Sequence, residues 1–390
     1  MRAQAWQKFR PSGRPGRGGP RRAMPVAVAA AVAAAAVTLG VLAPPPASAS
    51  ARPDTVQQGL NALVRTDGFP AALASVKDGK GRTRTFTAGV GDLATGSKVP
   101  VDGQVRIGSN TKTFTAVVVL QLVAEGKIDL DAVVDTYLPG LVRGEGIDGS
   151  HITVRQLLQH TSGLPDYEGD VYDDILRRRY FEPRDLLDIA FRHKAEFAPG
   201  EKWAYSNTNY VVAGLIVQKV TNRPLAEAIE GRIIKPTGLR HTYFPAPGDM
   251  GIREAHPKGY RRDAAGGPPR DITELDPSVG WAAGQMTSTN SDLNRFFTAL
   301  LAGRLLPAAQ LAQMRTTVPI EDTGVGYGLG LISRPLSCGG VYWGHGGDIP
   351  GYETRGGVTD DGRAANVTVT SLPTDGSEHL DSVVDTALCG

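Results

Sequence analysis

The chain has 390 residues, with 42 basic and 40 acidic side chains, seven histidines and only two cysteines. Seven of the basic residues and no acidic residue lie in the first 50 positions, which leaves 35 basic against 40 acidic residues in the rest of the chain. A mildly acidic chain lacks the basic surface that attracts nucleic acids and anionic membranes, so we expect neither as a partner.

The first 50 residues have the pattern of a targeting segment. A basic stretch precedes an apolar run at 26–43, and the small residues Ala47-Ser48-Ala49 end the segment. This order is typical of a secretory signal peptide that is cleaved near residue 49 or 51, so we predict a secreted, extracellular protein with no membrane contact after cleavage. Two alternatives stay open: a twin-arginine signal at Arg21-Arg22, and an uncleaved membrane anchor.

The rest of the chain predicts strands at both ends and helices between them. A helix is expected at 55–65, strands at 71–77, 83–91, 326–333, 341–345, 352–358 and 364–371, and a closing helix at 377–388. Two apolar runs in the mostly helical middle, 114–123 and 210–220, read as buried helices. This order predicts an α+β fold with one antiparallel sheet built from both chain ends, a helical insertion at roughly 109–310, and one domain over 55–390.

Ser109 and Lys112 are the first candidates for chemistry. They stand one helical turn apart at the start of a buried helix, so they share a face. A serine hydroxyl needs an adjacent base to attack an acyl carbon, and a lysine can be that base when burial lowers the pKa of its amine. Ser-x-x-Lys is the motif of penicillin-binding proteins and serine β-lactamases, although alone it is weak evidence.

Two partner motifs follow in the right order, Tyr205-Ser206-Asn207 and His345-Gly346-Gly347. Other catalytic patterns are absent from the sequence: there is no G-x-S-x-G elbow, no H-E-x-x-H and no C-x-x-C. We therefore expect no metal and no cofactor. The alternating glycines at 326, 328 and 330 lack the G-x-G-x-x-G spacing and predict a strand rather than a dinucleotide loop.

On these motifs the chain resembles the penicillin-recognising serine hydrolases, and most closely the secreted DD-carboxypeptidases related to class C β-lactamases. The resemblance runs from about residue 55 to the C-terminus. It includes similar stretches at 120–127, 137–140, 160–164 and 206–210. It implies a β-lactamase/transpeptidase-like fold, in which a sheet domain and an all-helical domain enclose the site.

The resemblance also implies roles for the motif residues. Ser109 is the nucleophile that forms an acyl-enzyme, and Lys112 is its activator. Tyr205 passes a proton to the leaving amine, which requires neighbours that lower the pKa of the phenol. Asn207 exchanges hydrogen bonds with the substrate amide. If the four residues have no catalytic role, the alternatives are ordinary structural ones: an N-cap serine, a surface lysine, a core tyrosine and an N-cap asparagine.

His345 stands where related β-lactamases usually carry lysine, which favours the carboxypeptidase branch. Gly346 and Gly347 would let the substrate lie along the strand edge. The backbone N–H groups of Ser109 and Asp348 would form the oxyanion hole.

Five further residues complete the expectations. Tyr172 and Trp281 are candidates for the acyl-donor side, with an ordinary core position as the alternative. The similar carboxypeptidases carry a disulfide at the positions of Cys338 and Cys389, where the alternative is two buried thiols. His160, in the 160–164 stretch, is more typical of a structural histidine.

The chain departs from the carboxypeptidase pattern where the substrate's terminal carboxylate is held. Those enzymes place threonine after the histidine and again two positions later, with an arginine on the preceding strand. Here these positions are Gly346, Asp348 and Ile332, and Arg334 on the face of Ile332 is the candidate substitute. An acid at 348 would repel a carboxylate unless it faces away, and could instead receive an ammonium group.

We predict a D-Ala-D-Ala carboxypeptidase that acts on cell-wall peptides, is inhibited by β-lactams and is a monomer. The alternative is an esterase, D-aminopeptidase or D-amino-acid amidase with the same catalytic set. A β-lactamase or a non-catalytic β-lactam sensor is less favoured.

Overall fold

The structure is a computed structural model that describes residues 54–176, 178–263, 267–373 and 379–390. The predicted signal peptide, residues 1–50, lies outside these ranges. Within them, none of the helices combines the length and apolar character that crossing a membrane requires.

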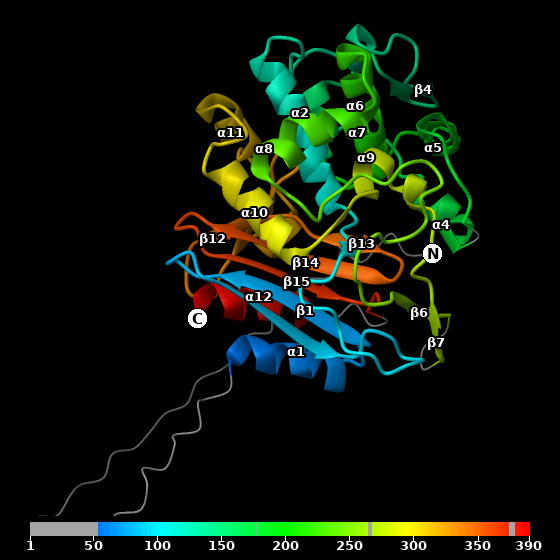
Figure 1. The fold of residues 1–390 in the computed structure, drawn as a ribbon. Helices are drawn as coiled ribbons and strands as arrows, with labels where there is room; N and C mark the ends of the chain where they lie inside the picture. The colour runs from blue at the N-terminus through cyan, green and yellow to red at the C-terminus, as the bar shows by residue number, and fades with distance from the viewer. Residues whose placement is uncertain (1–53, 177, 264–266, 374–378) are drawn as a thin grey trace, which may run out of the picture.

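One antiparallel sheet of nine strands runs through the described part of the chain (Figure 1). Its order is β2-β1-β15-β14-β12-β11-β10-β9, and β13 pairs with β14 outside this path. The strands are β1 (Ala71–Lys77), β2 (Thr83–Gly89), β9 (Val318–Pro319), β10 (Gly326–Tyr327), β11 (Ile332–Pro335), β12 (Val341–Gly344), β13 (Gly347–Ile349), β14 (Tyr352–Thr359) and β15 (Ala364–Val369). The N-terminal β1 pairs with the C-terminal β15, with Ala74 opposite Val367. The predicted α+β class and the sheet shared by both chain ends are therefore confirmed.

Helices α1 (Thr55–Arg65) and α12 (His379–Cys389) pack together on one face of this sheet (Figure 1). Leu60 and Val384 belong to the same buried apolar cluster as Val367 of β15. Gly59 permits the close approach of the two helices, because a Cβ there would lie 2.9 Å from the Val383 side chain. The first and last helices of the described residues thus form one layer.

A disulfide between Cys338 and Cys389 closes this layer. It ties the turn between β11 and β12 to the end of α12, across a sequence separation of 51 residues. The pairing implied by the resemblance is therefore present.

The opposite face of the sheet carries α10 (Asn290–Leu301) and, beyond it, the helical body (Figure 1). Two buried helices, α2 (Asn110–Ala124) and α6 (Asn207–Thr221), pack against each other within that body. Phe114 of α2 stacks on Phe296 of α10 with ring centroids 3.8 Å apart, which joins the body to the sheet layer. The remaining helices are α3 (Val154–Gln159), α4 (Glu168–Leu176), α5 (Pro183–Ala190), α7 (Leu225–Ile229), α8 (Lys235–Thr237), α9 (Trp281–Gly284) and α11 (Ala308–Met314).

Among the residues that the structure describes, three two-stranded ribbons lie outside the main sheet. They are β3 (Val105–Arg106) with β8 (Thr287–Ser288), β4 (Arg143–Gly144) with β5 (Ile147–Asp148), and β6 (Tyr260–Arg262) with β7 (Pro269–Asp271).

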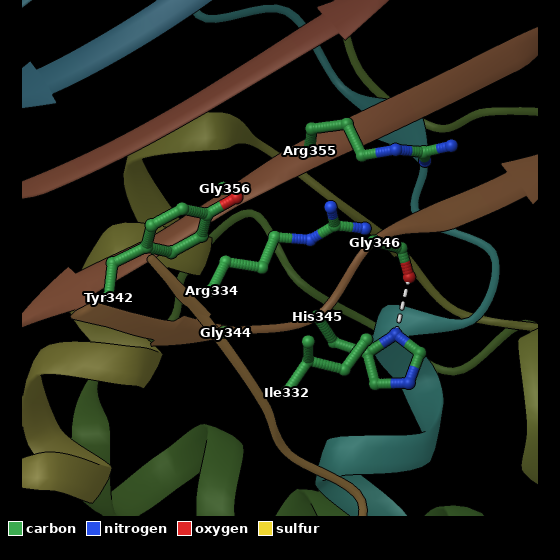
Figure 2. A pocket seen from close by; sticks show the side chains of 8 residues that line it. All are labelled: Ile332, Arg334, Tyr342, Gly344, His345, Gly346, Arg355 and Gly356. Atoms are coloured by element: carbon green, nitrogen blue, oxygen red, sulfur yellow. Dashed lines mark hydrogen bonds between the residues drawn. The ribbon is translucent and has the colours of Figure 1, made fainter. Parts of the chain in front are cut away.

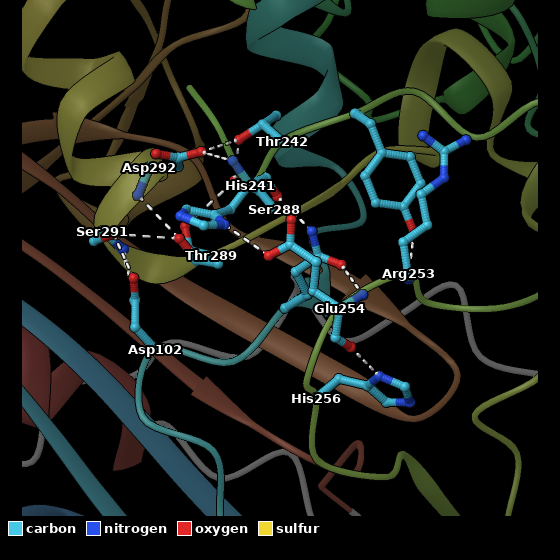
Figure 3. A network of polar contacts seen from close by, with 12 residues as sticks. Asp102, His241, Thr242, Arg253, Glu254, His256, Ser288, Thr289, Ser291 and Asp292 are labelled. Carbon is cyan, nitrogen blue, oxygen red and sulfur yellow. Dashed lines mark hydrogen bonds and ion pairs between the residues drawn. The ribbon is translucent and has the colours of Figure 1, made fainter. Parts of the chain in front are cut away.

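A polar network at the N-terminus of α10 holds the β3–β8 ribbon in place (Figure 3). The Asp292 carboxylate accepts hydrogen bonds from the Thr242 hydroxyl at 2.9 Å and from the backbone N–H of His241 at 2.8 Å. The Thr242 hydroxyl also lies 2.7 Å from that of Ser288 in β8. Because β3 pairs with β8, the network fixes the strand that leads into residues 107–109.

Residues 326–333 do not form the single strand predicted from their alternating glycines. They form β10, a turn and the start of β11, which pairs antiparallel with β10. Gly330 has φ +74 in the turn, and a Cβ there would lie 2.6 Å from the Ala116 side chain. The glycines therefore serve a reversal of the chain that packs directly on α2.

Candidate active site

Ser109 stands at the N-terminus of α2, on a sharp turn that follows β3. Gly108 in this turn has φ +47, a conformation that glycine adopts without strain. A Cβ on Gly108 would lie 2.9 Å from the backbone nitrogen of Asp348 in β13. The turn therefore brings Ser109 to the edge of the sheet.

Lys112 is completely buried one turn along α2, on the same side as Ser109. Its Nζ atom donates hydrogen bonds to the Ser109 hydroxyl at 3.0 Å, the Asn207 amide oxygen at 2.6 Å and the Ala283 carbonyl at 2.9 Å. Burial lowers the pKa of Lys112 to about 7 against the opposing pull of nearby carboxylates. A substantial fraction of neutral amine is thus present near neutral pH.

Tyr205 contacts both Lys112 and Ser109. Its ring centroid is 4.7 Å from the Lys112 Nζ, and its phenol hydrogen-bonds the Ser109 side chain. The expected lowering of the Tyr205 pKa does not occur: burial raises this pKa well above 10, and the bond to Ser109 opposes the rise only in part. Tyr205 is therefore a neutral phenol, which can give a proton but does not hold a negative charge at rest.

Asn207 occupies the first turn of α6 and links Lys112 to two carboxylates. Its Oδ1 accepts the hydrogen bond from Lys112, while its Nδ2 donates to Asp166 at 3.1 Å and to Glu168 at 3.0 Å. Both Nδ2 protons are committed within the protein. The hydrogen bond that we expected Asn207 to donate to a substrate amide would therefore have to replace one of these contacts.

Asp166 and Glu168 are site residues that the sequence analysis missed. Desolvation raises the pKa of both carboxyls, that of Glu168 to about 7, and Asp166 adds a second negative charge beside Glu168. Asp166 is half-buried. Glu168, at the start of α4, has solvent on one side and, on the other, the protein atoms that desolvate its carboxylate, among them the Asn207 amide. The one available signal was their place directly after the 160–164 stretch.

His345 lies between β12 and β13 and is 2% exposed. Burial lowers the pKa of its imidazole to about 3, helped by the positive charge of Lys112. The ring is therefore neutral at physiological pH. In this respect it differs from the lysine that related β-lactamases carry there.

The two glycines after His345 allow close contact with other segments. A Cβ on Gly347 would lie 1.9 Å from the Ile107 carbonyl oxygen, and one on Gly346 would lie 3.0 Å from the Arg355 guanidinium. Gly347 thus lets β13 lie directly against the segment that leads to Ser109.

The Asp348 side chain turns to an arginine of the neighbouring strand. Its carboxylate accepts a hydrogen bond from Arg355 at 2.7 Å, and Arg355 also pairs with the buried Glu353 at 2.7 Å. Desolvation raises the pKa of Glu353 to about 8, against the attraction of Arg355. The guanidinium therefore already faces two acidic groups of this chain.

Arg334, the candidate substitute for the missing carboxylate clamp, lines a small pocket together with His345 and Gly346 (Figure 2). Ile332, Tyr342 and Arg355 also line this pocket. The Arg334 side chain is 12% exposed and pairs with Asp381 of α12 at 3.3 Å. Like Arg355, it is already matched by an acid.

The two aromatic candidates are placed by other contacts. Trp281 packs over Gly214 of α6, where a built Cβ would lie 2.8 Å from its ring. The guanidinium carbon of Arg261 lies 5.1 Å from the ring centroid of Tyr172 in α4. Tyr172 follows Glu168 by one helical turn and so shares its face of α4, while Trp281 acts through the packing of α9 against α6.

A serine, a buried lysine and a tyrosine that meet in this way form the arrangement of a serine hydrolase. A family model described as Beta-lactamase matches residues 55–387, and the chain belongs to this family.

Solved structures agree with this assignment. The crystal structure of a D-stereospecific amidohydrolase from a Streptomyces species is 42% identical, with a TM-score of 0.78 over 86% of this chain and 98% of that one. The D-amino acid amidase from Ochrobactrum anthropi SV3, in complex with L-phenylalanine amide, is 29% identical, with a TM-score of 0.74 over 85% of this chain and 96% of that one.

Among curated proteins, penicillin-binding protein 4* of Bacillus subtilis is 28% identical over 261 residues. The match covers 64% of this chain and 56% of that protein, so the chain spans little more than half the length of this relative.

Proposed function

We propose that this serine hydrolase cleaves amides and esters of D-amino acids that carry a free α-ammonium group. The observation that carries the proposal is the pair of carboxylates, Asp166 and Glu168, held by the single amide of Asn207 beside Lys112 and Ser109. An ammonium group bound there would favour the charged forms of both acids.

The charges on the sheet side support the same substrate class. Arg355 faces Asp348 and Glu353, and Arg334 faces Asp381, so each guanidinium is already balanced. A substrate carboxylate would have to compete with these acids for its cation. Two solved relatives are named as a D-stereospecific amidohydrolase and a D-amino acid amidase, which fits a substrate with a free amine and no terminal carboxylate.

In the proposed reaction, neutral Lys112 accepts the Ser109 proton as the hydroxyl oxygen attacks the acyl carbon. The backbone N–H groups of Ser109 and Asp348, from the two segments that meet at Gly108, stabilise the oxyanion. Tyr205, which bonds the Ser109 side chain, gives its phenolic proton to the leaving amine and then takes the proton that Lys112 received from Ser109. Water then attacks the ester on Ser109 by the same route and releases the acid.

The predicted D-Ala-D-Ala carboxypeptidase is the second candidate. It is favoured by the two guanidinium groups close to His345, those of Arg334 and Arg355, since displacement of one internal acid would free a guanidinium for a terminal carboxylate (Figure 2). The penicillin-binding relative points the same way. Export fits either activity, because the Cys338–Cys389 bridge suits an oxidising compartment.

The deciding experiment compares three substrates under the same conditions: D-phenylalanine amide, N-acetyl-D-phenylalanine amide, and a diacetylated Lys-D-Ala-D-Ala peptide. We expect ammonia release from D-phenylalanine amide, with kcat/KM at least about tenfold lower for the acetylated amide, since a charge-assisted hydrogen bond is lost. Ser109→Ala should abolish all turnover. D-alanine release from the peptide, with no preference for a free amine, would establish the carboxypeptidase instead.

The Glu168→Gln variant links this specificity to its residue. It should raise KM for D-phenylalanine amide while leaving KM for the acetylated amide nearly unchanged. Equal effects on the two amides would show that Glu168 does not bind the α-ammonium group of the substrate.

A further inference from the structure

A series of buried side chains connects the Tyr205-Ser206-Asn207 motif to the His345-Gly346-Gly347 motif. Its two central residues, His160 and Tyr327, belong to neither motif. His160 follows α3, with no exposed surface, and Tyr327 lies in β10, equally buried. The His160 Nε2 is 3.1 Å from the Tyr327 hydroxyl, which is 3.1 Å from the His345 Nε2. The contacts run from the helical body through β10 to the residue before β13.

The protons of this chain can be assigned from the His160 end. The backbone N–H of Ser206 points to the His160 Nδ1 at 3.2 Å, and the Asn209 amide lies 3.1 Å from the same atom. A backbone N–H can only donate, so this Nδ1 is an acceptor and carries no proton. Burial lowers the pKa of His160 well below 6.5, so the ring is neutral and its one proton is on Nε2. His160 therefore donates to the Tyr327 oxygen.

The contacts of His345 independently give the same direction of hydrogen bonding, from His160 through Tyr327 to His345. Its Nδ1 lies 2.6 Å from the Gly346 carbonyl oxygen, which can only accept. The proton of the neutral ring is therefore on Nδ1, and the bare Nε2 accepts from Tyr327. Tyr327 thus accepts from one histidine and donates to the other.

Tyr210 of α6 is the competing acceptor. Its hydroxyl interacts with that of Tyr327 and gives its own proton to the Leu158 carbonyl at 2.9 Å. It can therefore only accept from Tyr327. An imidazole nitrogen is the more basic acceptor, so the Tyr327 proton belongs to His345.

The chain of contacts reaches the catalytic residues at both ends. The His160 ring packs against the Tyr205 ring, with centroids 4.3 Å apart and planes 32° from parallel, and His160 also holds the backbone of Ser206. His345 at the other end begins the segment whose Gly347 lies against the approach to Ser109. A movement at Tyr327 would therefore shift Tyr205 relative to Ser109.

We propose that Tyr327 is a positioning residue for the acyl-transfer reaction: its hydroxyl bridges His160 and His345, fixes both rings as neutral tautomers of defined orientation, and sets Tyr205 and the β12–β13 segment around Ser109. The proposal rests on the serine hydrolase chemistry of the family and not on the proposed substrate.

The charged groups around His345 give the bridge a pH signature. Lys112 of α2, Arg355 of β14 and Arg334 of β11 all disfavour a proton on His345. The hydrogen bond from Tyr327 stabilises the neutral ring as well, because it occupies the lone pair that a proton would take. Removing the hydroxyl therefore raises the pKa of His345 above its wild-type value of about 3, a shift that an NMR titration of the His345 ring can follow.

The first test reads the tautomers directly and needs no substrate. In nitrogen-15 NMR spectra of the full mature protein, His345 should carry its proton on Nδ1 and His160 on Nε2, with the His345 signals assigned from a His345→Gln variant. A proton on the His345 Nε2, or a charged ring in either residue at neutral pH, would overturn the proposal.

The second test compares Tyr327→Phe with Tyr210→Phe, using hydrolysis of p-nitrophenyl acetate. Both variants lose one buried hydroxyl of the same cluster, but only Tyr327→Phe breaks the bridge. We expect Tyr327→Phe to lower kcat by about ten- to a hundredfold with KM little changed, as small misplacements of catalytic groups do. In Tyr327→Phe the nitrogen-15 titration of His345 should shift to higher pH, while Tyr210→Phe keeps the wild-type titration of this ring. Identical His345 titrations in the two variants would reduce Tyr327 to a packing residue.

Discussion

The side-chain nitrogen of Lys112 lies 3.0 Å from the hydroxyl oxygen of Ser109, and Lys112 is completely buried. This pairing makes the protonation state of one amine decisive for the reactivity of the serine. Burial is the cause of the lowered pKa, and the carboxylates linked through Asn207 limit how far it falls.

Replacement of Lys112 should therefore remove most activity. Lys112→Met should lower kcat by about a hundredfold or more, in the range that general-base catalysis contributes. Lys112→Arg should not restore it, because a guanidinium keeps its proton. In the wild type, kcat/KM should rise with pH through about 7, where Lys112 loses its proton. An active arginine variant, or a flat profile across this range, would contradict the role of Lys112.

The same shift predicts how stability depends on pH. The pKa of Lys112 is about 7 in the folded protein against 10.5 for an unperturbed lysine, so the unfolded chain binds more protons between these values. The free energy of unfolding contributed by this group should therefore rise with pH over that interval. Urea unfolding of the wild type and of Lys112→Met at several pH values measures the difference, and parallel curves would argue against the shift.

Removal of the Glu168 charge should move the pH profile of the enzyme. The Glu168 carboxylate favours the charged form of Lys112, so Glu168→Gln should lower the pKa of Lys112 and shift the rising limb of kcat/KM to lower pH. Asp170→Asn on the same helix is the control, since Asp170 pairs with His193 at 2.6 Å instead. The shift should be absent in that variant, and its presence there would indicate a general effect of charge.

Gly347 should tolerate no side chain. A Cβ at this position would lie 1.9 Å from the Ile107 carbonyl oxygen, and that contact is with backbone, which cannot rotate away. Gly347→Ala should therefore push β13 from the segment before Ser109 and lower both activity and melting temperature. Gly231→Ala is the matched control, because nothing lies within 4 Å of its built Cβ. Full activity in Gly347→Ala would show that the two segments are free to separate.

Loss of the disulfide should destabilise the layer formed by the chain ends. The Cys338–Cys389 bridge spans 51 residues, and a loop of this size contributes about 4 kcal/mol in the chain-entropy treatment. A double serine variant should unfold at lower urea concentration by a corresponding amount, while kcat stays close to that of the wild type because the bridge is remote from Ser109. An unchanged urea midpoint would mean that α12 holds its place by packing alone.

The sequence by itself was sufficient for the architecture and the reactive centre. Apolar periodicity located α1, β1 and the buried helices, since these signals are local and repeat over many residues. Ser109 and Lys112 could be paired because a helix fixes the distance between positions three apart. The turn at 328–331 could not be read, because a glycine that permits an extended strand also permits a reversal, and only contact with α2 selects between them.

The tertiary structure alone decided the electrostatics of the site. Asp166 and Glu168 carry no motif, and they matter because folding brings both to the amide of Asn207, about forty residues away in the sequence. The direction of the Tyr205 pKa, the internal partners of Arg334 and Arg355, and the link from His160 to His345 likewise depend on burial and on contacts between distant segments. A linear pattern shows which groups can react, whereas their charge and orientation depend on what the fold places beside them.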